Sequence, residues 1–176
     1  MKTIRVARSA LGSYEAIGDP TAADVVIGHS FGTVTSEGSA NRALAGFILA
    51  HSKGRPVVVD RTLANAFPGG SQHVDHIVEG PVTNVRGQGV GTWGTLVEAK
   101  QFMDDEELSL ALMVAQSHHI GRVIMQAEKL GIDSIVPPGL PSGFDLGSRQ
   151  WWTKSKALWV PYEVLGSFVL RKQGKL

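Results

Sequence analysis

The run Val25-Val-Ile-Gly28 is apolar up to its closing glycine and shows no alternation of polar and apolar side chains. Such a run is typical of a strand that is buried on both faces of a sheet. Arg55–Asp60 and Leu108–Ala115 also read as strands, and a helical pattern follows each of the three runs. Because strands alternate with helices and no hairpin signal separates them, the sequence predicts an α/β fold with a parallel sheet covered on both faces.

The remaining elements are predicted from shorter patterns. Ser39 is placed to cap a helix, and Gly131 to end another. Pro161 is expected to break or kink the last helix, since proline has no N–H to donate. Residues 87–94 hold four glycines and are expected to be irregular. The expected elements are short strands at 4–7, 76–79 and 133–136, a helical turn at 63–67, and helices at 39–51, 95–103, 120–130 and 148–172.

Length and composition exclude several classes of protein. The 176 residues, 43% hydrophobic and 19% charged, fit one globular domain spanning 1–176. A formal net charge of +1 predicts no broad basic face for nucleic acid. No apolar run approaches 18 residues and no secretory signal is recognisable, so no membrane is expected and a cytoplasmic location follows by default. The chain has no cysteine, which excludes disulfides and thiolate metal ligands.

Polar loops follow three of the predicted strands, at 28–38, 60–65 and 115–122. In parallel sheets ligands bind beyond the carboxyl ends of the strands, so these loops are the candidate binding site. The first loop contributes Gly28, His29, Ser30 and Gly32, whose backbone amides are expected to face a ligand. Asp60 is either an acceptor for a ligand hydroxyl or the N-cap of the next helix. Arg42 either reaches the site from the first helix or pairs on the surface.

Gly28-His-Ser-Phe-Gly32 also spells G-x-S-x-G, the nucleophile elbow of α/β-hydrolases. A small serine hydrolase or esterase using Ser30, with His119 as base and Asp60 as acid, is therefore the alternative function. Only 27 residues precede the elbow, which is few for the strands and oxyanion loop that such a fold places upstream. The stretch after Gly32 is β-branched and contains glycine, where the elbow requires an immediate helix. A ligand-binding loop is the preferred interpretation.

The segment Gln116-Ser-His-His-Ile-Gly-Arg122 lies at the end of the best strand and the start of a helix. Exposed N–H groups at a helix start favour an anion, and Arg122 and the imidazoles of His118 and His119 add charge-assisted bonds. Gln116 and Ser117 belong to the same turn. A metal site is the sharper alternative, but the sequence offers no further histidine or cysteine at ligand spacing, and no metal is expected. The simplest interpretation is that one of the two histidines caps the helix and the other is solvated.

His119 and Arg122 form a His-x-x-Arg pattern at the end of a strand. In this pattern the chain resembles the YdcF/SanA/ElyC-type family of unknown function. Thr95 and Ala99 also match, whereas Glu98 stands where the family has Asn. The departures from the pattern are Gly94, Ala115, Gln116 and Val123. An Asp-x-x-x-x-Gly strand (Asp24, Gly28), Arg42 in the next helix, and Trp159 with Glu163 in the last helix resemble the family as well.

The resemblance implies a Rossmann-like three-layer αβα sandwich with a mainly parallel sheet, whose loops converge on one polar pocket. It also implies a soluble, YdcF-like protein with a nucleotide-type ligand such as S-adenosylmethionine, which is the only cofactor suggested. Within that pocket His119 is the expected acid or base, Arg122 the anion clamp, and Thr95 and Glu98 further ligand contacts. The aromatic residues near the C-terminus are expected in the core or in the contact of a possible homodimer.

Overall fold

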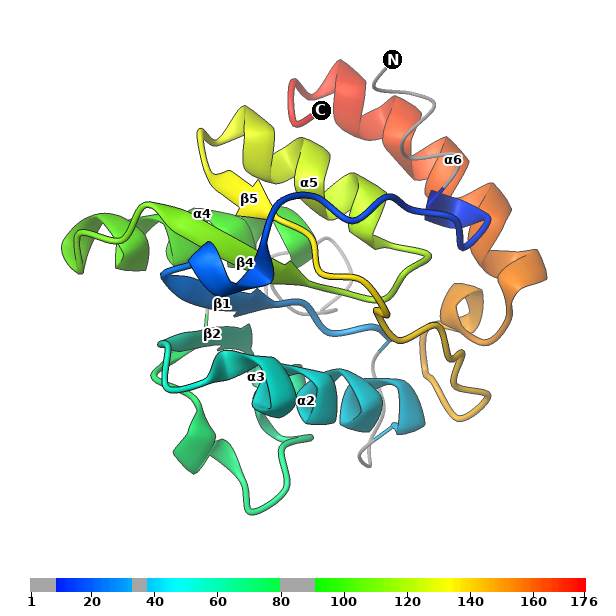
Figure 1. The fold of residues 1–176 in the computed structure, drawn as a ribbon. Coiled ribbons are helices and arrows are strands. Elements are labelled where there is room, and N and C mark those ends of the chain that lie inside the picture. Colours follow the sequence, from blue (N-terminus) through cyan, green and yellow to red (C-terminus); the bar gives the residue numbers. More distant parts are fainter. Residues whose placement is uncertain (1–8, 33–37, 80–90) are drawn as a thin grey trace.

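The computed structural model describes residues 9–32, 38–79 and 91–176, and its centre is a five-stranded sheet (Figure 1). All strand pairs are parallel, and the strand order is β3-β2-β1-β4-β5. The predicted α/β fold is therefore confirmed. The strands are β1 (Val25–Gly28), β2 (Val57–Asp60), β3 (His76–Val78), β4 (Leu110–Val114) and β5 (Asp133–Ile135).

Helices cover both faces of this sheet and make the expected three layers (Figure 1). Helices α2 (Ser39–Ser52) and α3 (Arg61–Ala64) pack together on one face. On the other face α4 (Gly91–Asp105) packs beside α5 (Ile120–Lys129), and α6 (Lys156–Lys172) lies outermost. Three short 3-10 helices complete the described elements: η1 (Pro20–Ala22), η2 (Ser71–His73) and η3 (Trp151–Thr153).

Strand β1 is the centre of the core. It pairs with β2 on one side, Val26 opposite Val57, and with β4 on the other, Ile27 opposite Met113. All four residues of β1 and of β2 are buried, as their apolar runs predict. Side chains from α2 close over one face of the strand, with Leu44 and Ile48 fully buried as expected. A two-sided burial of this kind requires helices on both faces, which is why the apolar runs predicted the layers correctly.

Several helix ends differ from the sequence prediction. Gly38, in extended backbone, is the N-cap of α2 and Ser39 is the first helical residue, so the predicted serine cap was wrong. Helix α4 begins at Gly91, within the stretch that was expected to be irregular, and not at 95, because a glycine with φ of 68° can open a helix. Helix α6 begins at Lys156, not 148, and runs through Pro161 without a break. The strand predicted at 4–7 lies outside the described residues.

None of the helices in the described ranges is long and apolar enough to cross a membrane.

Candidate functional site

The strand order reverses between β1 and β4, and we call the region beyond the carboxyl ends of these two strands the crevice. The chain leaves β1 toward α2 on one face and leaves β4 toward α5 on the other, so the two following loops diverge. This reversal is the place where open parallel sheets bind ligands. Two of the three loops that the sequence singled out, 28–38 and 115–122, therefore begin at this point.

Aromatic side chains and helix α6 close much of the crevice. The ring of Phe31 meets Trp159 edge to face at 4.8 Å and Phe144 at 5.6 Å. The indole N–H of Trp159 donates to the carbonyl of His118 over 2.9 Å, which ties α6 to the loop after β4. Trp159 and Trp152 are buried, and Tyr162 stacks on Trp152. Trp152 and Trp159 thus belong to the core, whereas Trp151 and Phe168 are exposed.

A chain of polar side chains runs beneath this aromatic cover. His119 places its Nε2 atom 3.1 Å from the hydroxyl of Thr92 and its Nδ1 atom 3.2 Å from Nη2 of Arg122. Arg122 Nε lies 3.1 Å from Oε1 of Glu163, and the same oxygen is 3.5 Å from Nδ1 of His119. The Arg122 guanidinium also lies over the Trp159 ring at 5.8 Å. Residues from α4, α5 and α6 therefore meet at the carboxyl end of β4.

Several buried polar atoms near this chain have no hydrogen-bond partner among the described residues. They include Nε2 of His29, both side-chain polar atoms of Gln116, and both carboxylate oxygens of Glu163. Arg122 and Glu163 satisfy the distance for an ion pair, but the N–H of Arg122 does not point at the oxygen, so charge holds the pair without a hydrogen bond. Buried polar groups are nearly always bonded. Their concentration at one crevice marks it as a site that can accept a polar ligand.

Burial keeps the histidines of the crevice neutral. Desolvation lowers the pKa of His119, and the neighbouring Arg122 cation lowers it further, while Glu163 opposes both effects. Desolvation also lowers the pKa of His29 to about 3, with smaller contributions from His119 and Arg122. The charge on Arg122 is therefore the persistent positive charge of the cluster.

Acid is expected to destabilise the protein through His29. An unfolded histidine titrates near 6.5 and folded His29 near 3, so between these values the unfolded state binds one more proton. The free energy of unfolding should fall by up to about 1.4 kcal/mol for each pH unit of acidification in that window. Urea titrations at pH 7.5, 6 and 5 should show a flatter decline for His29→Leu than for the unmodified chain. Parallel declines would contradict this assignment.

The loop after β4 lies deeper than predicted. Gln116, Ser117 and His118 are buried, and the amides of Ile120 and Arg122 donate to carbonyls within the turn. The hydroxyl of Ser9 accepts from the amide of Gly121 at 2.9 Å and donates to the carbonyl of Ser117 at 2.8 Å. The expected exposed N–H groups at the start of α5 are thus already bonded, because Ser9 caps the amide of Gly121 and carbonyls of the turn accept from Ile120 and Arg122. An anion cannot use these amides.

The loop after β1 forms a second polar cluster. The carboxylate of Asp60 accepts from the amide of Ser30 at 2.9 Å, and it also caps α3 through the amide of Leu63 at 3.1 Å. Burial raises the pKa of Asp60 against these bonds. The amide of Phe31 donates to Asn41 at 2.8 Å. These bonds fix the loop, and no described hydrogen bond joins Ser30 to a histidine.

The two glycines of this loop serve packing. A Cβ atom on Gly28 would lie 2.5 Å from Ile48 and 2.9 Å from Val59, so the missing side chain lets α2 and β2 approach the strand. Gly32, with φ of 76°, would place a Cβ atom 2.8 Å from the hydroxyls of both Ser148 and Thr153. The loop before α6 therefore covers the loop after β1.

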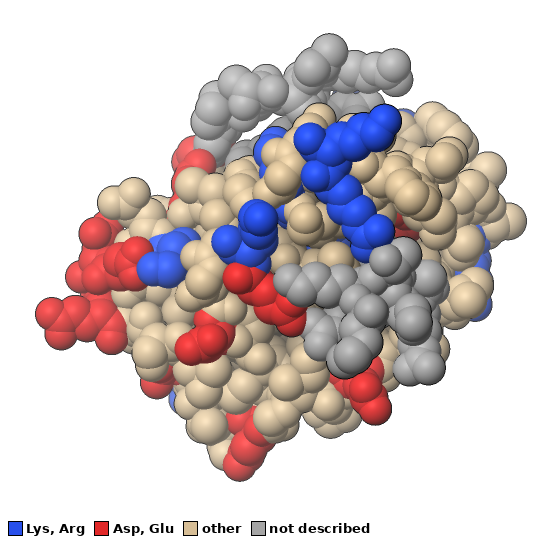
Figure 2. Space-filling model, turned by 90° about the horizontal axis from the view of Figure 1, so that it is seen from above, with Lys and Arg blue, Asp and Glu red and all other residues tan. Residues whose placement is uncertain are grey.

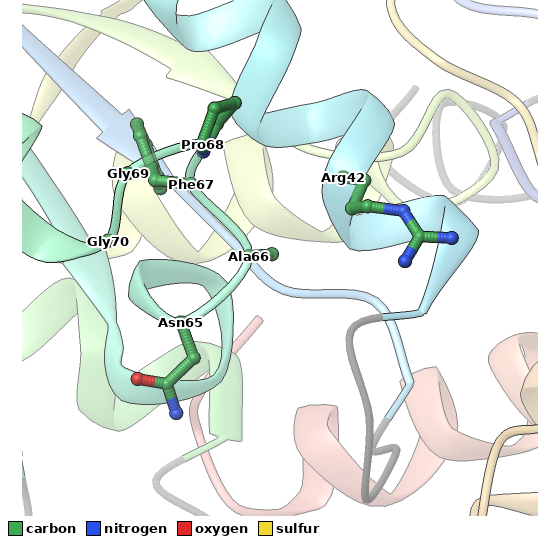
Figure 3. Close-up of a pocket in the computed structure, with 7 residues that line it drawn as sticks. All are labelled: Arg42, Asn65, Ala66, Phe67, Pro68, Gly69 and Gly70. Atoms are coloured by element: carbon green, nitrogen blue, oxygen red, sulfur yellow. The ribbon is translucent and has the colours of Figure 1, made fainter.

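The other predicted residues make no described side-chain contact with His119 or Arg122. Arg42 is exposed on α2 and lines a hollow of about 390 Å³ with the segment after α3 (Figure 3). Thr95 is buried and donates to the carbonyl of Gly91 at 3.2 Å, in its own helix. Glu98 is half-buried. Arg42 thus lines a hollow with the segment after α3, whereas the predicted ligand contacts of Thr95 and Glu98 stay predictions. The remaining residues that line the hollow are Asn65, Ala66, Phe67, Pro68, Gly69 and Gly70.

Sequence reasoning missed Thr92 and Glu163 as members of the site. Glu163 stands four residues after Trp159 and four before Ser167, and all three are buried on one face of α6. A charged residue on the buried stripe of a helix was the available signal for Glu163. Thr92 gave none, because it lies in a glycine-rich stretch that was expected to be irregular.

The described part of the chain holds no group of three or more His, Cys, Asp or Glu residues that could bind a metal ion. No family model, no curated protein and no solved structure matches the chain.

Proposed function

We propose that this chain is a YdcF-like protein that binds a small anionic or nucleotide-type ligand, with S-adenosylmethionine as the first candidate, at the carboxyl ends of β1 and β4. The observation that supports the proposal is the chain of Thr92, His119, Arg122 and Glu163 in the crevice between those strands. Unbonded buried polar atoms surround it. Retaining such atoms is unfavourable for stability alone, so a binding role explains them better.

The positions that carry the family resemblance also support the proposal. The pair His119 and Arg122 is far in the sequence from the pair Trp159 and Glu163, yet the two pairs contact one another. Asp24, which belongs to the same resemblance, lies at the amino end of β1, away from the carboxyl ends of the strands. It accepts hydrogen bonds from the amides of Ser109 and Leu110. We assign Asp24 to the fold and the four other residues to the site.

Arg122 is the proposed anion contact. A guanidinium has five N–H donors, and among the described residues the neighbours Glu163 and His119 each face one of its nitrogen atoms. The Arg122 side chain is 14% exposed, so part of it reaches the surface of the crevice. Glu163 holds the guanidinium in place and leaves the remaining donors for a carboxylate or phosphate, which bind arginine in a planar fork. If the ligand reacts, His119 is the proposed acid or base.

The alternative of a serine hydrolase receives less support from the geometry. A serine nucleophile needs a base within hydrogen-bond reach of its hydroxyl. Ser30 instead faces Asp60, which accepts its amide, while the described contacts of His119 are to Thr92, Arg122, Trp159 and Glu163. We therefore prefer the binding function.

Thermal unfolding with S-adenosylmethionine, ATP or inorganic phosphate is expected to test the proposal. A ligand at 100 times its Kd should stabilise the protein by about 2.7 kcal/mol. Arg122→Lys keeps the charge beside Glu163 but loses the fork, so it should weaken binding about 10-fold or more. Lys100→Ala, which changes a cation paired with Asp104 on the outer face of α4, should leave binding unchanged. Equal binding by both variants, or no shift with any of the three probes, would contradict the proposal.

A further inference from the structure

Thr92 lies in the first turn of α4 and faces the crevice. It is half-buried, and its hydroxyl lies 3.1 Å from Nε2 of His119. Gly91 before it has φ of 68°, a conformation that favours glycine and sets the direction in which the helix begins. The hydroxyl therefore contacts a buried imidazole, while the Thr92 residue remains partly exposed.

Arg122 can only donate hydrogen bonds, and this fixes the direction of the bonds that link Arg122, His119 and Thr92. Its Nη2 atom lies 3.2 Å from Nδ1 of His119 with hydrogen-bond geometry, and a guanidinium cannot accept. Nδ1 must then be the unprotonated nitrogen. Glu163 competes for the same atom, but at 3.5 Å it lies beyond a good hydrogen bond. Since burial keeps the ring neutral, its one proton is on Nε2 and points at Thr92.

The oxygen of Thr92 therefore accepts a hydrogen bond from Nε2–H of His119. Its own O–H remains available to donate. We infer that Thr92 is a ligand-contacting residue whose hydroxyl donates to an acceptor oxygen, such as that of a phosphate or carboxylate group. The helix dipole at the start of α4, a helix of 15 residues, favours a negative group at the same place. The inference rests on the proposed function and names the chemical class of the ligand atom.

The direction of the hydrogen bonds can be measured without a ligand. Nitrogen-15 shifts of the imidazole of His119, assigned with His119→Gln, should show a protonated Nε2 and a bare Nδ1 at pH 7.5. Thr92→Val should perturb the Nε2 signal, because it removes the acceptor. A protonated Nδ1 would overturn the inference, since Nε2 would then accept from Thr92 and the hydroxyl would have no donor left for a ligand.

The binding assay compares Thr92→Ser, which keeps the hydroxyl, with Thr92→Val, which removes it at nearly equal size. Calorimetric titration with ATP and with inorganic phosphate should give binding by Thr92→Ser close to that of the unmodified chain, and binding by Thr92→Val about 10- to 100-fold weaker. Thr21→Val, at an exposed threonine before β1, is the control for the substitution itself.

The outcomes separate this inference from the function on which it rests. If the unmodified chain binds a probe and Thr92→Val binds it equally well, the role of Thr92 is overturned and the binding function stands. If the unmodified chain binds neither probe while S-adenosylmethionine binds, a phosphate acceptor is overturned; Thr92→Ser and Thr92→Val are then compared with S-adenosylmethionine, whose carboxylate is the remaining acceptor, and equal binding by Thr92→Val overturns the inference. If none of the three binds, the proposed function itself fails. A loss confined to Thr92→Val supports the inference.

Discussion

Arg122→Met is expected to lower the free energy of unfolding by about 3–5 kcal/mol, because it leaves the buried carboxylate of Glu163 without its cation. Glu163 is only 1% exposed, and its oxygens accept no hydrogen bond from the described residues. His119, at 3.5 Å, is the remaining neighbour, and it is neutral. Denaturation in urea at pH 7.5, followed by circular dichroism, measures the loss.

A double-mutant cycle distinguishes the lost ion pair from lost packing. Arg122→Met with Glu163→Leu removes both charges, and a buried pair replaced by apolar groups is often neutral or stabilising. The double variant should therefore recover most of the loss seen in Arg122→Met, with a coupling of about 1 kcal/mol or more. Independent effects that simply add would show that the pair contributes through packing against Trp159, not through charge.

The same substitutions separate stability from function. If the buried charges serve only the fold, the double variant should be as stable as the unmodified chain and should bind the probe ligands equally well. If they hold Arg122 for a ligand, the double variant folds and does not bind. The second result is the one expected here, because apolar residues would have filled this position at lower cost.

The distribution of charge agrees with a locally concentrated site. Figure 2, which faces the layer of α5 and α6, shows Lys and Arg side chains gathered near the middle of the face and most acidic side chains toward its edge. The formal net charge of the whole chain is only +1. An anionic ligand would therefore be attracted by local groups such as Arg122 and not by the field of the whole protein.

The fold was predictable because a strand that is buried on both faces is apolar along its whole length. Val25–Gly28 and Leu110–Val114 can be apolar throughout only if helices cover both faces, and this one fact implied the parallel layers. Element ends were harder. Ser39 and Gly38 were both acceptable caps by residue type, and the backbone conformation of Gly38, which no pattern reveals, decided between them.

The site was predictable only in part, for a physical reason. Topology brings loop ends together, so the loops holding His29 and His119 were placed correctly at one crevice. What covers a crevice depends on distant segments, and here Ser9 caps the start of α5 while Glu163 enters from α6. The contact of Ser9 has no local signal, and the signal for Glu163 is only its place on the buried face of α6. The expected amide site at Gln116–Arg122 was therefore wrong, whereas the two side chains at its end, His119 and Arg122, do meet.

Gly28→Ala should lower the free energy of unfolding by about 1–3 kcal/mol, since overpacking a filled core forces side chains off their preferred rotamers. The added Cβ atom would lie 2.5 Å from Ile48, 2.9 Å from Val59 and 3.0 Å from Leu63. These three side chains come from α2, β2 and α3, so no single movement relieves all the contacts.

Gly46→Ala is the matched control, because Gly46 lies in the exposed interior of α2 with no atom within 4 Å of an added Cβ. There alanine should stabilise by about 0.5–1 kcal/mol through helix propensity. Thermal and urea unfolding of both variants should give opposite signs. The comparison bears directly on function: a glycine that faced a ligand would tolerate alanine when no ligand is bound, whereas one that admits α2 to the sheet would not. If Gly28→Ala is as stable as the unmodified chain, then Gly28 belongs to the binding loop that the sequence suggested and its packing role is refuted.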